Sequence, residues 1–260
     1  MTSHTDSAFW NEYWDSVQLP LEVQKSSSLL MRAITDVFDR FLAGKQQQSV
    51  LEVGGAPGQY AAYVHRRLGH TVTIFDNSRV GCDKARENFN LLGIPGKVVF
   101  GDMFTPPPEL SRFEVVYSLG LIEHFEDVVR AVRAHTRLVK PGGLLILGIP
   151  NLRGLNGFLM RRLAPSFLDK HELDAMDESA WDTFEEALGL DRLYRAYIGG
   201  FEGRTFWRCE SRTVRDRLIH RVLWHVGKAL DRKKLWFLRR PNSRYWSAYL
   251  IGVYRVPVPM

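Results

Sequence analysis

The chain has 260 residues, 45% of them hydrophobic and 25% charged, which suits a globular protein with one sizeable core. No run reaches the roughly 18 to 20 apolar residues that cross a bilayer, and the N-terminus lacks the order of a secretory signal. The two cysteines, Cys82 and Cys209, form no CxxC pair, which excludes a disulfide framework and a cysteine zinc site. We therefore expect a soluble protein of the reducing cytoplasm.

The net charge of +6 is unevenly distributed along the chain. Residues 203–245 contain 13 Lys or Arg against 3 Asp or Glu. Such a segment attracts membrane phosphates, nucleic acid or an acidic substrate, and charge alone does not choose among these partners.

Hydrophobic periodicity predicts two N-terminal helices and then an alternation of short strands and helices. The predicted helices cover residues 8–16, 22–42, 59–68, 79–92, 126–139, 154–163, 177–187 and 213–234. The predicted strands cover residues 49–53, 71–75, 97–100, 114–118, 144–149, 193–198 and 247–256. Alternation of this kind is typical of βαβ units and a parallel sheet.

A glycine-rich turn follows the first predicted strand, in the segment Glu52-Val53-Gly54-Gly55-Ala56-Pro57-Gly58. A tight turn between strand and helix lets the backbone approach a ligand at the carboxyl edge of the sheet. The spacing Gly54-x-x-x-Gly58 departs from the GxGxxG of dinucleotide sites, which disfavours a nicotinamide-dependent dehydrogenase. A turn of this type is also common without any ligand.

Two carboxylates follow the next two predicted strands. Asp76 lies 22 positions after Gly54, where a carboxylate can accept hydrogen bonds from both hydroxyls of a ribose. Asp102 follows the third strand on the same edge and could accept a hydrogen bond from an adenine amine. Either residue could instead be an ordinary turn residue or helix cap.

The order of these motifs resembles that of class I S-adenosylmethionine-dependent methyltransferases, with Leu138-Val139-Lys140-Pro141-Gly142-Gly143 as a further match. The run SLGLIEHF at residues 118–125 is similar to the fourth-strand motif of their type 11 and 12 branch, which includes quinone and small-molecule methyltransferases. The run FWNEYW at residues 9–14 is similar to that branch's N-terminal aromatic helix. The motif-bearing core spans about residues 48–152.

The resemblance implies a Rossmann-like α/β fold, with a seven-stranded mixed sheet in the order 3-2-1-4-5-7-6, helices on both faces and the last strand antiparallel. It implies S-adenosylmethionine as cofactor and S-adenosylhomocysteine as product. The residues then expected to contact the cofactor are Trp14, Glu52, Gly54, Ala56, Gly58, Asp76, Asn77, Asp102, Met103, Leu119 and Gly120.

The expected organisation is a single domain over residues 1–260. A helical cap at 1–47 precedes the cofactor-binding core at 48–152, and an acceptor-pocket or lid segment follows at 153–190. Residues 191–260 supply the last two strands and the basic helical insertion at 203–245.

Two histidines are candidates for catalysis. Methyl transfer from a sulfonium depends mainly on positioning, and a base is needed only if the acceptor must lose a proton. His124 follows the fourth strand, although the Glu123-His124 pair could equally order the loop, and His171 lies in the acceptor segment. Of the remaining histidines, His65, His70 and His135 are expected at the surface. His220 and His225 are five residues apart on a helix, a poor spacing for metal ligands, so no catalytic metal is predicted.

The function we expect is methyl transfer to a small-molecule acceptor, with oxygen favoured over nitrogen. One alternative is a lipid-like or polysaccharide-linked acceptor at an anionic membrane, with helix 213–234 lying in the interface. Docking of that helix on the core is favoured, through Val214, Leu218, Ile219, Val222, Leu223, Val226 and Leu230 on one side. Another alternative is a non-catalytic cofactor-binding partner subunit. The absence of an evident base-flipping motif argues against nucleic acid as a partner, and the oligomeric state stays open.

Overall fold

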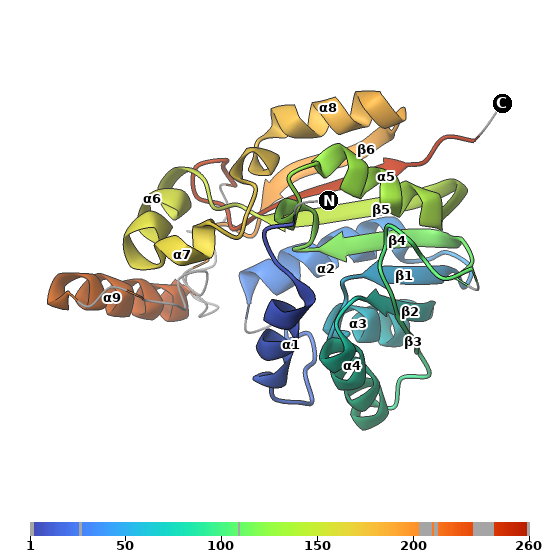
Figure 1. The fold of residues 1–260 in the computed structure, drawn as a ribbon, viewed down its shortest axis with the longest axis horizontal. Coiled ribbons are helices and arrows are strands. Elements are labelled where there is room, and N and C mark those ends of the chain that lie inside the picture. Colours follow the sequence, from blue (N-terminus) through green and yellow to red (C-terminus); the bar gives the residue numbers. More distant parts are fainter. Residues whose placement is uncertain are drawn as a thin grey trace.

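The computed structural model describes residues 3–25, 28–108, 110–202, 210, 213–230 and 242–258, the side chains of 228–230 excepted. A single mixed sheet lies between two layers of helices (Figure 1). Its strands are β1 (Ser49–Val53), β2 (Thr71–Asp76), β3 (Lys97–Phe100), β4 (Phe113–Leu119), β5 (Val139–Pro150), β6 (Asp191–Ile198) and β7 (Tyr249–Arg255).

The strand order is β3-β2-β1-β4-β5-β7-β6. Strands β1 to β5 pair in parallel, and β7 is antiparallel to both β5 and β6. The predicted sheet is thereby confirmed. Because β1, β2 and β4 are parallel, their carboxyl ends meet at one edge of the sheet, where ligands bind in folds of this kind.

Helices cover both faces of the sheet. They are α1 (Ser7–Asp15), α2 (Leu29–Leu42), α3 (Gln59–Leu68), α4 (Arg79–Leu92), α5 (Val128–Leu138), α6 (Gly154–Leu163), α7 (Pro165–Leu168), α8 (Glu178–Leu188) and α9 (Val214–Leu230), with 3-10 turns η1 (Ile122–His124) and η2 (Leu173–Met176). Figure 1 shows α2, α3 and α4 on one face and α5 and α8 on the other.

Strand β1 shows how the sheet divides the core in two. Val50 packs with residues of α2, α3 and α4, whereas Leu51 and Val53 pack with residues of α5 and α8. Alternate side chains of a strand point to opposite faces, so one strand contributes to both cores. The sheet is buried on both sides, as expected of a parallel sheet between helices.

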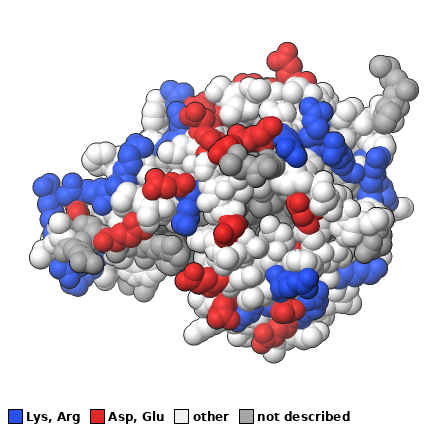
Figure 2. All heavy atoms as spheres, in the orientation of Figure 1, with Lys and Arg blue, Asp and Glu red and all other residues white. Residues whose placement is uncertain are grey.

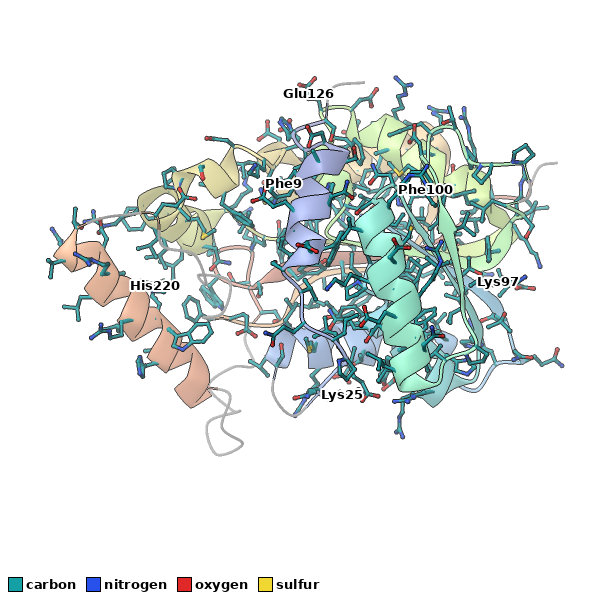
Figure 3. The ribbon with its side chains drawn as sticks, turned by 60° about the horizontal axis from the view of Figure 1, so that its bottom comes forward. Phe9, Lys25, Lys97, Phe100, Glu126 and His220 are labelled. Carbon is teal, nitrogen blue, oxygen red and sulfur yellow. The ribbon has the colours of Figure 1, made fainter. Side chains whose placement is uncertain are left out.

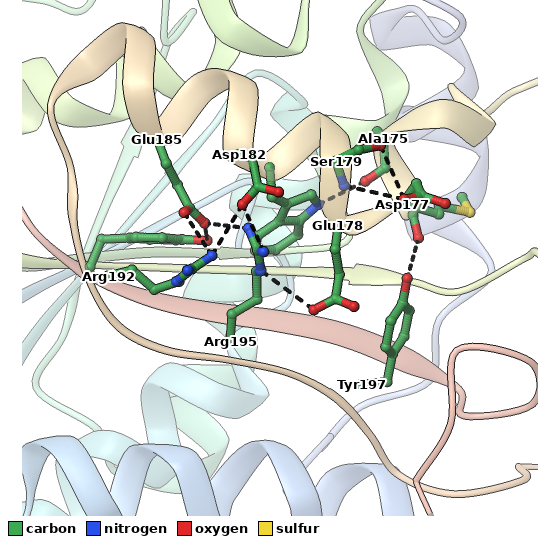
Figure 4. Close-up of polar contacts among 12 residues, drawn as sticks. Ala175, Asp177, Glu178, Ser179, Asp182, Glu185, Arg192, Arg195 and Tyr197 are labelled. Atoms are coloured by element: carbon green, nitrogen blue, oxygen red, sulfur yellow. Dashed lines mark hydrogen bonds and ion pairs between the residues drawn. The ribbon is translucent and has the colours of Figure 1, made fainter.

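Ion pairs fasten α8 to the outer strand β6 (Figure 4). Arg195 lies 2.8 Å from both Asp182 and Glu185, and Arg192 lies 3.1 Å from the same two side chains. Glu185 also accepts a hydrogen bond from the Tyr254 hydroxyl, at 2.8 Å. These contacts hold α8 against the outermost strand of the sheet.

Two predicted boundaries are wrong. The helix expected at 22–42 begins only at Leu29, because the Ser28 hydroxyl accepts a hydrogen bond from the Met31 N–H and caps it. Strand β5 begins at Val139 instead of residue 144, since Val139 pairs with Phe113 before the register shifts to Val115. Residues 140–143 therefore form an irregularity inside the strand and not a connection before it.

His70 and His135 are buried, contrary to the surface positions expected of them. The ring of His70 accepts from the Gln48 N–H at Nδ1 and donates to the Leu42 carbonyl from Nε2. His135 donates from Nδ1 to the Ala131 carbonyl. Backbone groups thus satisfy both ring nitrogens of His70, whereas Nε2 of His135 has no hydrogen-bond partner among the described residues, and sequence spacing reveals neither arrangement.

Helix α9 lies at one end of the molecule, next to α6 (Figure 1). Its expected single apolar face is divided: Ile219 and Leu223 pack against the core, whereas Val214, Leu218 and Val222 are exposed. Residues 203–209, 211–212 and 231–241 of the basic insertion lie outside the described residues. None of the helices in the described part of the chain is long and apolar enough to span a membrane.

Candidate functional site

The loop between β1 and α3 depends on glycine for its shape. Gly54 and Gly58 have φ angles of +66° and +86°, which disfavour any residue with a Cβ atom. A Cβ at Gly58 would lie 2.5 Å from Ile74 Cδ1 and 2.7 Å from Phe89 Cε1. Gly58 therefore lets the start of α3 sit directly against β2 and α4, with the rest of the loop held at the sheet edge.

Asp76, the last residue of β2, is tied to this loop. Its Oδ2 accepts from the Ala56 N–H at 3.2 Å, and its Oδ1 accepts from the Ser78 N–H at 2.8 Å. Burial raises the pKa of the carboxyl, and the backbone hydrogen bonds oppose this rise. A carboxylate has about four lone-pair sites, so two bonds leave capacity for hydroxyl groups of a ligand.

Glu52 lies beneath the loop and is buried. Its Oε2 accepts from the Tyr117 hydroxyl at 2.8 Å and from the Ala61 N–H at 3.2 Å, which ties β1 to β4 and α3. Burial raises the pKa of this carboxyl to about 8. A nearby cation would favour its ionised form.

Two adjoining cavities open at this sheet edge. The larger, of about 340 Å³, is lined by Phe9, Trp10, Tyr13, Trp14, Val17, Leu21, Glu52, Gly54, Gly55, Ala56, Pro57, Gln59, Tyr60, Asp76, Asn77, Leu119, Gly120, Leu121, Glu123, His124, Phe167, Lys170 and His171. The smaller, of about 100 Å³, is lined by Ser3, Thr5, Trp10, Val53, Gly54, Phe75, Asp76, Asn77, Gly101, Asp102, Met103, Phe104, Leu121, His124 and Phe125. Asp76 and Asn77 belong to both, so a ribose held there could place its two substituents in separate cavities.

Helix α1 forms the outer wall of both cavities. Figure 3 shows it beside α4, with Phe9 on its upper part. The Ser78 hydroxyl donates to Asn11 Oδ1 at 2.7 Å, and a Cβ at Gly81 would lie 2.8 Å from Trp14 Cδ1. A glycine on α4 thus allows the Trp14 ring to settle over the loop.

His124 and His171 meet in the larger cavity, with ring centroids 4.7 Å apart. His124 Nδ1 donates to the Lys170 carbonyl at 2.7 Å, and His171 Nδ1 donates to the Phe167 carbonyl at 2.8 Å. A carbonyl can only accept, so each Nδ1 carries the proton and each Nε2 keeps its lone pair. Burial lowers the pKa of His124 to about 3 and that of His171 to about 4, which leaves both rings neutral.

Glu123 stands next to this pair. Its Oε2 is buried and has no hydrogen-bond partner among the described residues, and burial raises its pKa to about 8. Glu123, His124 and His171 each offer a ligand atom, and these atoms lie within 4.8 Å of one another. The arrangement could accept a proton from a hydroxyl group, and the same atoms are of a type that binds divalent metals.

The charges around the larger cavity favour a cationic ligand. Three buried carboxyl groups, those of Glu52, Asp76 and Glu123, belong to its lining. Among the lining residues Lys170 is the one Lys or Arg, and its Nζ lies 4.2 Å from the centroid of the Phe9 ring. Burial raises the pKa of all three carboxyl groups, and a bound positive charge would favour their ionised forms, whereas a negative pyrophosphate would gain no such attraction.

Most of the residues predicted for the site come together here. Trp14, Glu52, Gly54, Ala56, Leu119 and Gly120 line the larger cavity, Asp102 and Met103 line the smaller, and Asp76 and Asn77 line both. Gly58 lines neither and serves the packing of the loop. The larger cavity is also lined by residues that were not predicted as cofactor contacts, among them Trp10, Tyr60, Leu121, Glu123 and Lys170.

The middle of the chain is similar in sequence to a known family of domains. Residues 50–143 match the model of a methyltransferase domain. Ubiquinone biosynthesis O-methyltransferase from Alkalilimnicola ehrlichii is 30% identical over 163 residues, which cover 62% of this chain and 64% of that protein. The 27-O-demethylrifamycin SV methyltransferase from Amycolatopsis mediterranei is 29% identical over 154 residues, 55% of this chain and 53% of that protein. The chain thus spans less than two thirds of the length of these relatives.

Solved structures share the fold over nearly the whole chain. N-methyltransferase NodS from Bradyrhizobium japonicum, in complex with S-adenosylhomocysteine, superposes with a TM-score of 0.58 at 12% identity and covers 97% of this chain and 100% of its own. The [4+2]-cyclase SpnF superposes with a TM-score of 0.61 at 17% identity and covers 100% and 98%. At these identities the likeness concerns the fold alone.

Proposed function

Because this chain belongs to the class I S-adenosylmethionine-dependent methyltransferases, we propose that it methylates a small-molecule acceptor, at oxygen in preference to nitrogen. The observation that carries the proposal is the wall of three buried carboxyl groups beneath a glycine loop that lacks the dinucleotide spacing. A sulfonium is a cation, and a nicotinamide dinucleotide carries a negative pyrophosphate. A cation bound beside these carboxyl groups would favour their ionised forms, so the wall suits the first ligand, whereas the pyrophosphate of the second would oppose that ionisation.

The residues present fit this cofactor. Asp76 would accept from the ribose hydroxyls, and Asp102 and Met103 would hold the adenine in the smaller cavity. The backbone of Gly54 to Ala56 and the ring of Trp14 would enclose the methionine part. When bound, S-adenosylmethionine supplies a methyl carbon already activated by the positive sulfur, so much of the catalysis can come from positioning.

His124 is the base that we propose for an acceptor hydroxyl. Its Nδ1–H is held by the Lys170 carbonyl, which directs the lone pair of Nε2 away from the backbone. The ring is neutral across the physiological pH range and its lowered pKa makes it a weaker base than an ordinary histidine. It can still take the hydroxyl proton as the oxygen attacks, because the hydroxyl becomes strongly acidic once the new C–O bond forms. His171, with the same backbone anchor, would accept a second hydrogen bond from the acceptor or take the proton itself.

Relatives support oxygen as the acceptor atom. The matched relative from Alkalilimnicola ehrlichii is described as an O-methyltransferase, and the relative from Amycolatopsis mediterranei acts on a 27-O-demethyl compound. Phenols and other hydroxyl compounds that fit the remaining cavity are therefore the first acceptors to test.

Calorimetry tests the cofactor directly. S-adenosylmethionine, S-adenosylhomocysteine and NAD are titrated into the wild-type chain, into Asp76→Ala and into Asp83→Ala. Both adenosyl compounds should bind, and Asp76→Ala should weaken them by about 10- to 100-fold through the loss of charged hydrogen bonds. Asp83→Ala is the matched control, because that exposed carboxylate pairs with Arg86 on the outside of α4.

Transfer itself is followed with methyl-labelled cofactor and a panel of hydroxyl and amine acceptors. Label that enters hydroxyl compounds supports the proposal, and label confined to amines moves the acceptor atom to nitrogen. NAD binding in place of the adenosyl compounds would overturn the assignment of the cofactor. Cofactor binding without transfer to any acceptor would favour a non-catalytic partner subunit.

A further inference from the structure

Helix α9 exposes apolar side chains that a folded chain normally buries. Val214, Leu218, Val222 and Val226 are 77%, 59%, 52% and 42% exposed, and they follow one another at four-residue intervals. Residues four apart lie on the same side of a helix, one turn above the other. The four side chains therefore form one stripe along the length of α9.

A neighbouring face of α9, about 100° round the helix from the stripe, holds the helix on the protein. Ile219 and Leu223 pack against the main core, and Asp216 accepts from Arg162 of α6 at 2.5 Å. The helix is thus already docked through one face, and the exposed stripe is not the surface used for docking. A second apolar face on a docked helix calls for a separate partner.

Positive charge borders the stripe. The exposed residues Arg217 and Arg221 each directly precede a stripe residue, and the exposed Arg215 follows Val214. The one acidic residue of α9, Asp216, is buried against Arg162 and so does not offset this charge at the surface. Figure 2 shows Lys and Arg gathered over the end of the molecule where α9 lies.

We propose that this stripe docks α9 on an anionic membrane surface. The helix would lie in the plane of the interface, with the four aliphatic side chains among the acyl chains and the arginines at the phosphates. An apolar stripe with basic borders matches that surface in both polarity and charge. A polyanion such as RNA would use the arginines and leave the aliphatic stripe in water.

The position of α9 connects this surface with the site. Helix α9 packs on α6, α6 packs on α7, and the residues that follow α7 supply Lys170 and His171 to the larger cavity. Glu210, close before α9 in the chain, bonds to Leu163 and Ser166 at the junction of α6 and α7. A docked α9 would hold this wall of the cavity near the lipid surface. The docking itself does not depend on methyl transfer.

Vesicle co-sedimentation of the full chain tests the proposal. Vesicles of phosphatidylcholine are compared with vesicles of phosphatidylcholine and phosphatidylglycerol, and the wild type should bind the anionic ones more tightly. Leu218→Gln with Val222→Gln should lower the partition coefficient by about tenfold or more, because two apolar side chains lose their burial. Leu91→Gln is the matched control, since Leu91 is 57% exposed on the distant helix α4.

Charge is tested separately. Arg215→Gln with Arg221→Gln should weaken binding by about fivefold for each arginine at low salt. Arg133→Gln with Arg137→Gln, an exposed pair four residues apart on α5, should leave binding unchanged. Circular dichroism and calorimetry with S-adenosylhomocysteine check that each variant keeps its fold and its cofactor site.

Three outcomes would overturn the proposal. Equal binding to neutral and anionic vesicles would show that charge plays no role. Equal binding by the wild type and by the Leu218→Gln, Val222→Gln variant would show that the arginines bind the vesicles without the aliphatic stripe. A wild-type dimer that becomes a monomer in that variant, without vesicle binding, would assign the stripe to a second copy of the chain. Vesicle binding by a chain that does not bind the adenosyl compounds would sink the proposed function alone.

Discussion

The imidazole of His124 lies against that of His171, 4.7 Å between ring centroids, and each ring donates its Nδ1 proton to a backbone carbonyl of the same short segment. The two carbonyls belong to Lys170 and Phe167, so the end of α7 sets the tautomer of both rings. This fixes two hydrogen-bond acceptors in one cavity without the use of any other side chain.

Replacement of His124 should separate catalysis from cofactor binding. His124→Asn is expected to lower turnover by about 10² to 10⁴, the usual worth of a general base, while the affinity for S-adenosylhomocysteine stays within a few-fold of wild type. His135→Asn is the matched control, because that ring is also buried and also donates from Nδ1 to a backbone carbonyl. Unchanged turnover in His124→Asn would remove His124 from catalysis.

The pH dependence of kcat/KM should lack the fall at acidic pH that protonation of an ordinary histidine causes. Burial lowers the pKa of His124 to about 3 and that of His171 to about 4, so the basic form predominates well below pH 6. At saturating cofactor we expect no loss of kcat/KM for the acceptor with a midpoint near pH 6.5, the pKa of an unperturbed histidine, and we assign any change near pH 8 to Glu52 and Glu123, whose pKa values burial raises to about 8. Rates measured from pH 8 to about pH 5, with cofactor affinity as a control, test this expectation. A midpoint near pH 6.5 would contradict the buried, neutral pair.

Glu123 should make folding stability depend on pH. Burial raises its folded pKa to about 8 from an ordinary value of 4.5, so between these values the folded state holds more protons than the unfolded state. The free energy of unfolding of the wild type therefore falls as the pH rises through this window. A glutamine does not ionise, so it adds no such pH dependence. The stability of Glu123→Gln relative to wild type should rise between pH 5 and pH 8 by on the order of a few kcal/mol.

Urea unfolding at both pH values measures this difference. Glu87→Gln, at an exposed position on α4, should keep the wild-type pH dependence. Glu52 is present in both proteins, so its own effect cancels from the comparison. A difference between Glu123→Gln and wild type that is equal at pH 5 and pH 8 would mean that Glu123 ionises normally.

Gly58 can be compared with a glycine that differs only in its surroundings. Both Gly58 and Gly93 have positive φ angles, but a Cβ at Gly93 meets nothing within 4 Å, whereas one at Gly58 meets Ile74 and Phe89. Gly93→Ala should cost about 1 kcal/mol of stability through backbone strain. Gly58→Ala should cost about 1 to 3 kcal/mol more, because the new methyl group overpacks the core. Equal costs in urea unfolding would show that the packing around Gly58 gives way easily.

Removal of metal should leave catalysis intact. In the proposed mechanism His124 and His171 act through free Nε2 lone pairs, so dialysis against EDTA should not change turnover. If activity is lost and Zn²⁺ or Mn²⁺ restores it, Glu123, His124 and His171 are metal ligands, a role that the distances among their ligand atoms allow.

The residues at the sheet edge could be predicted because each follows its strand directly. Gly54, Asp76 and Asp102 come within a few positions of the ends of β1, β2 and β3, and parallel strands bring those ends together without further information. The order of the strands came from the family resemblance, since no local pattern decides which strand lies next to which.

The walls of the cavities could not be predicted in the same way. Lys170 lies more than 100 positions from the glycine loop and Trp10 more than 40, and both reach the cavity through packing between helices. The aromatic run at residues 9–14 is the one signal in the sequence for this wall. It predicts Trp14 as a cofactor contact but does not distinguish Trp10 from its aromatic neighbours. Which side chains of α9 face inward also depends on docking. Six aliphatic side chains of this helix are described, and only contact with the core distinguishes Ile219 and Leu223, which face inward, from the other four.

Helix α1 has a consequence for the order of events in turnover. It walls both cavities through Trp10, and none of its own residues is fully buried, so it can move away without exposing a core side chain of its own. An adenosyl ligand that spans both cavities must enter and leave past this helix, and the acceptor then meets a site already enclosed on that side. We expect ordered kinetics: cofactor first, acceptor second, and S-adenosylhomocysteine released last at a rate set by the lifting of α1.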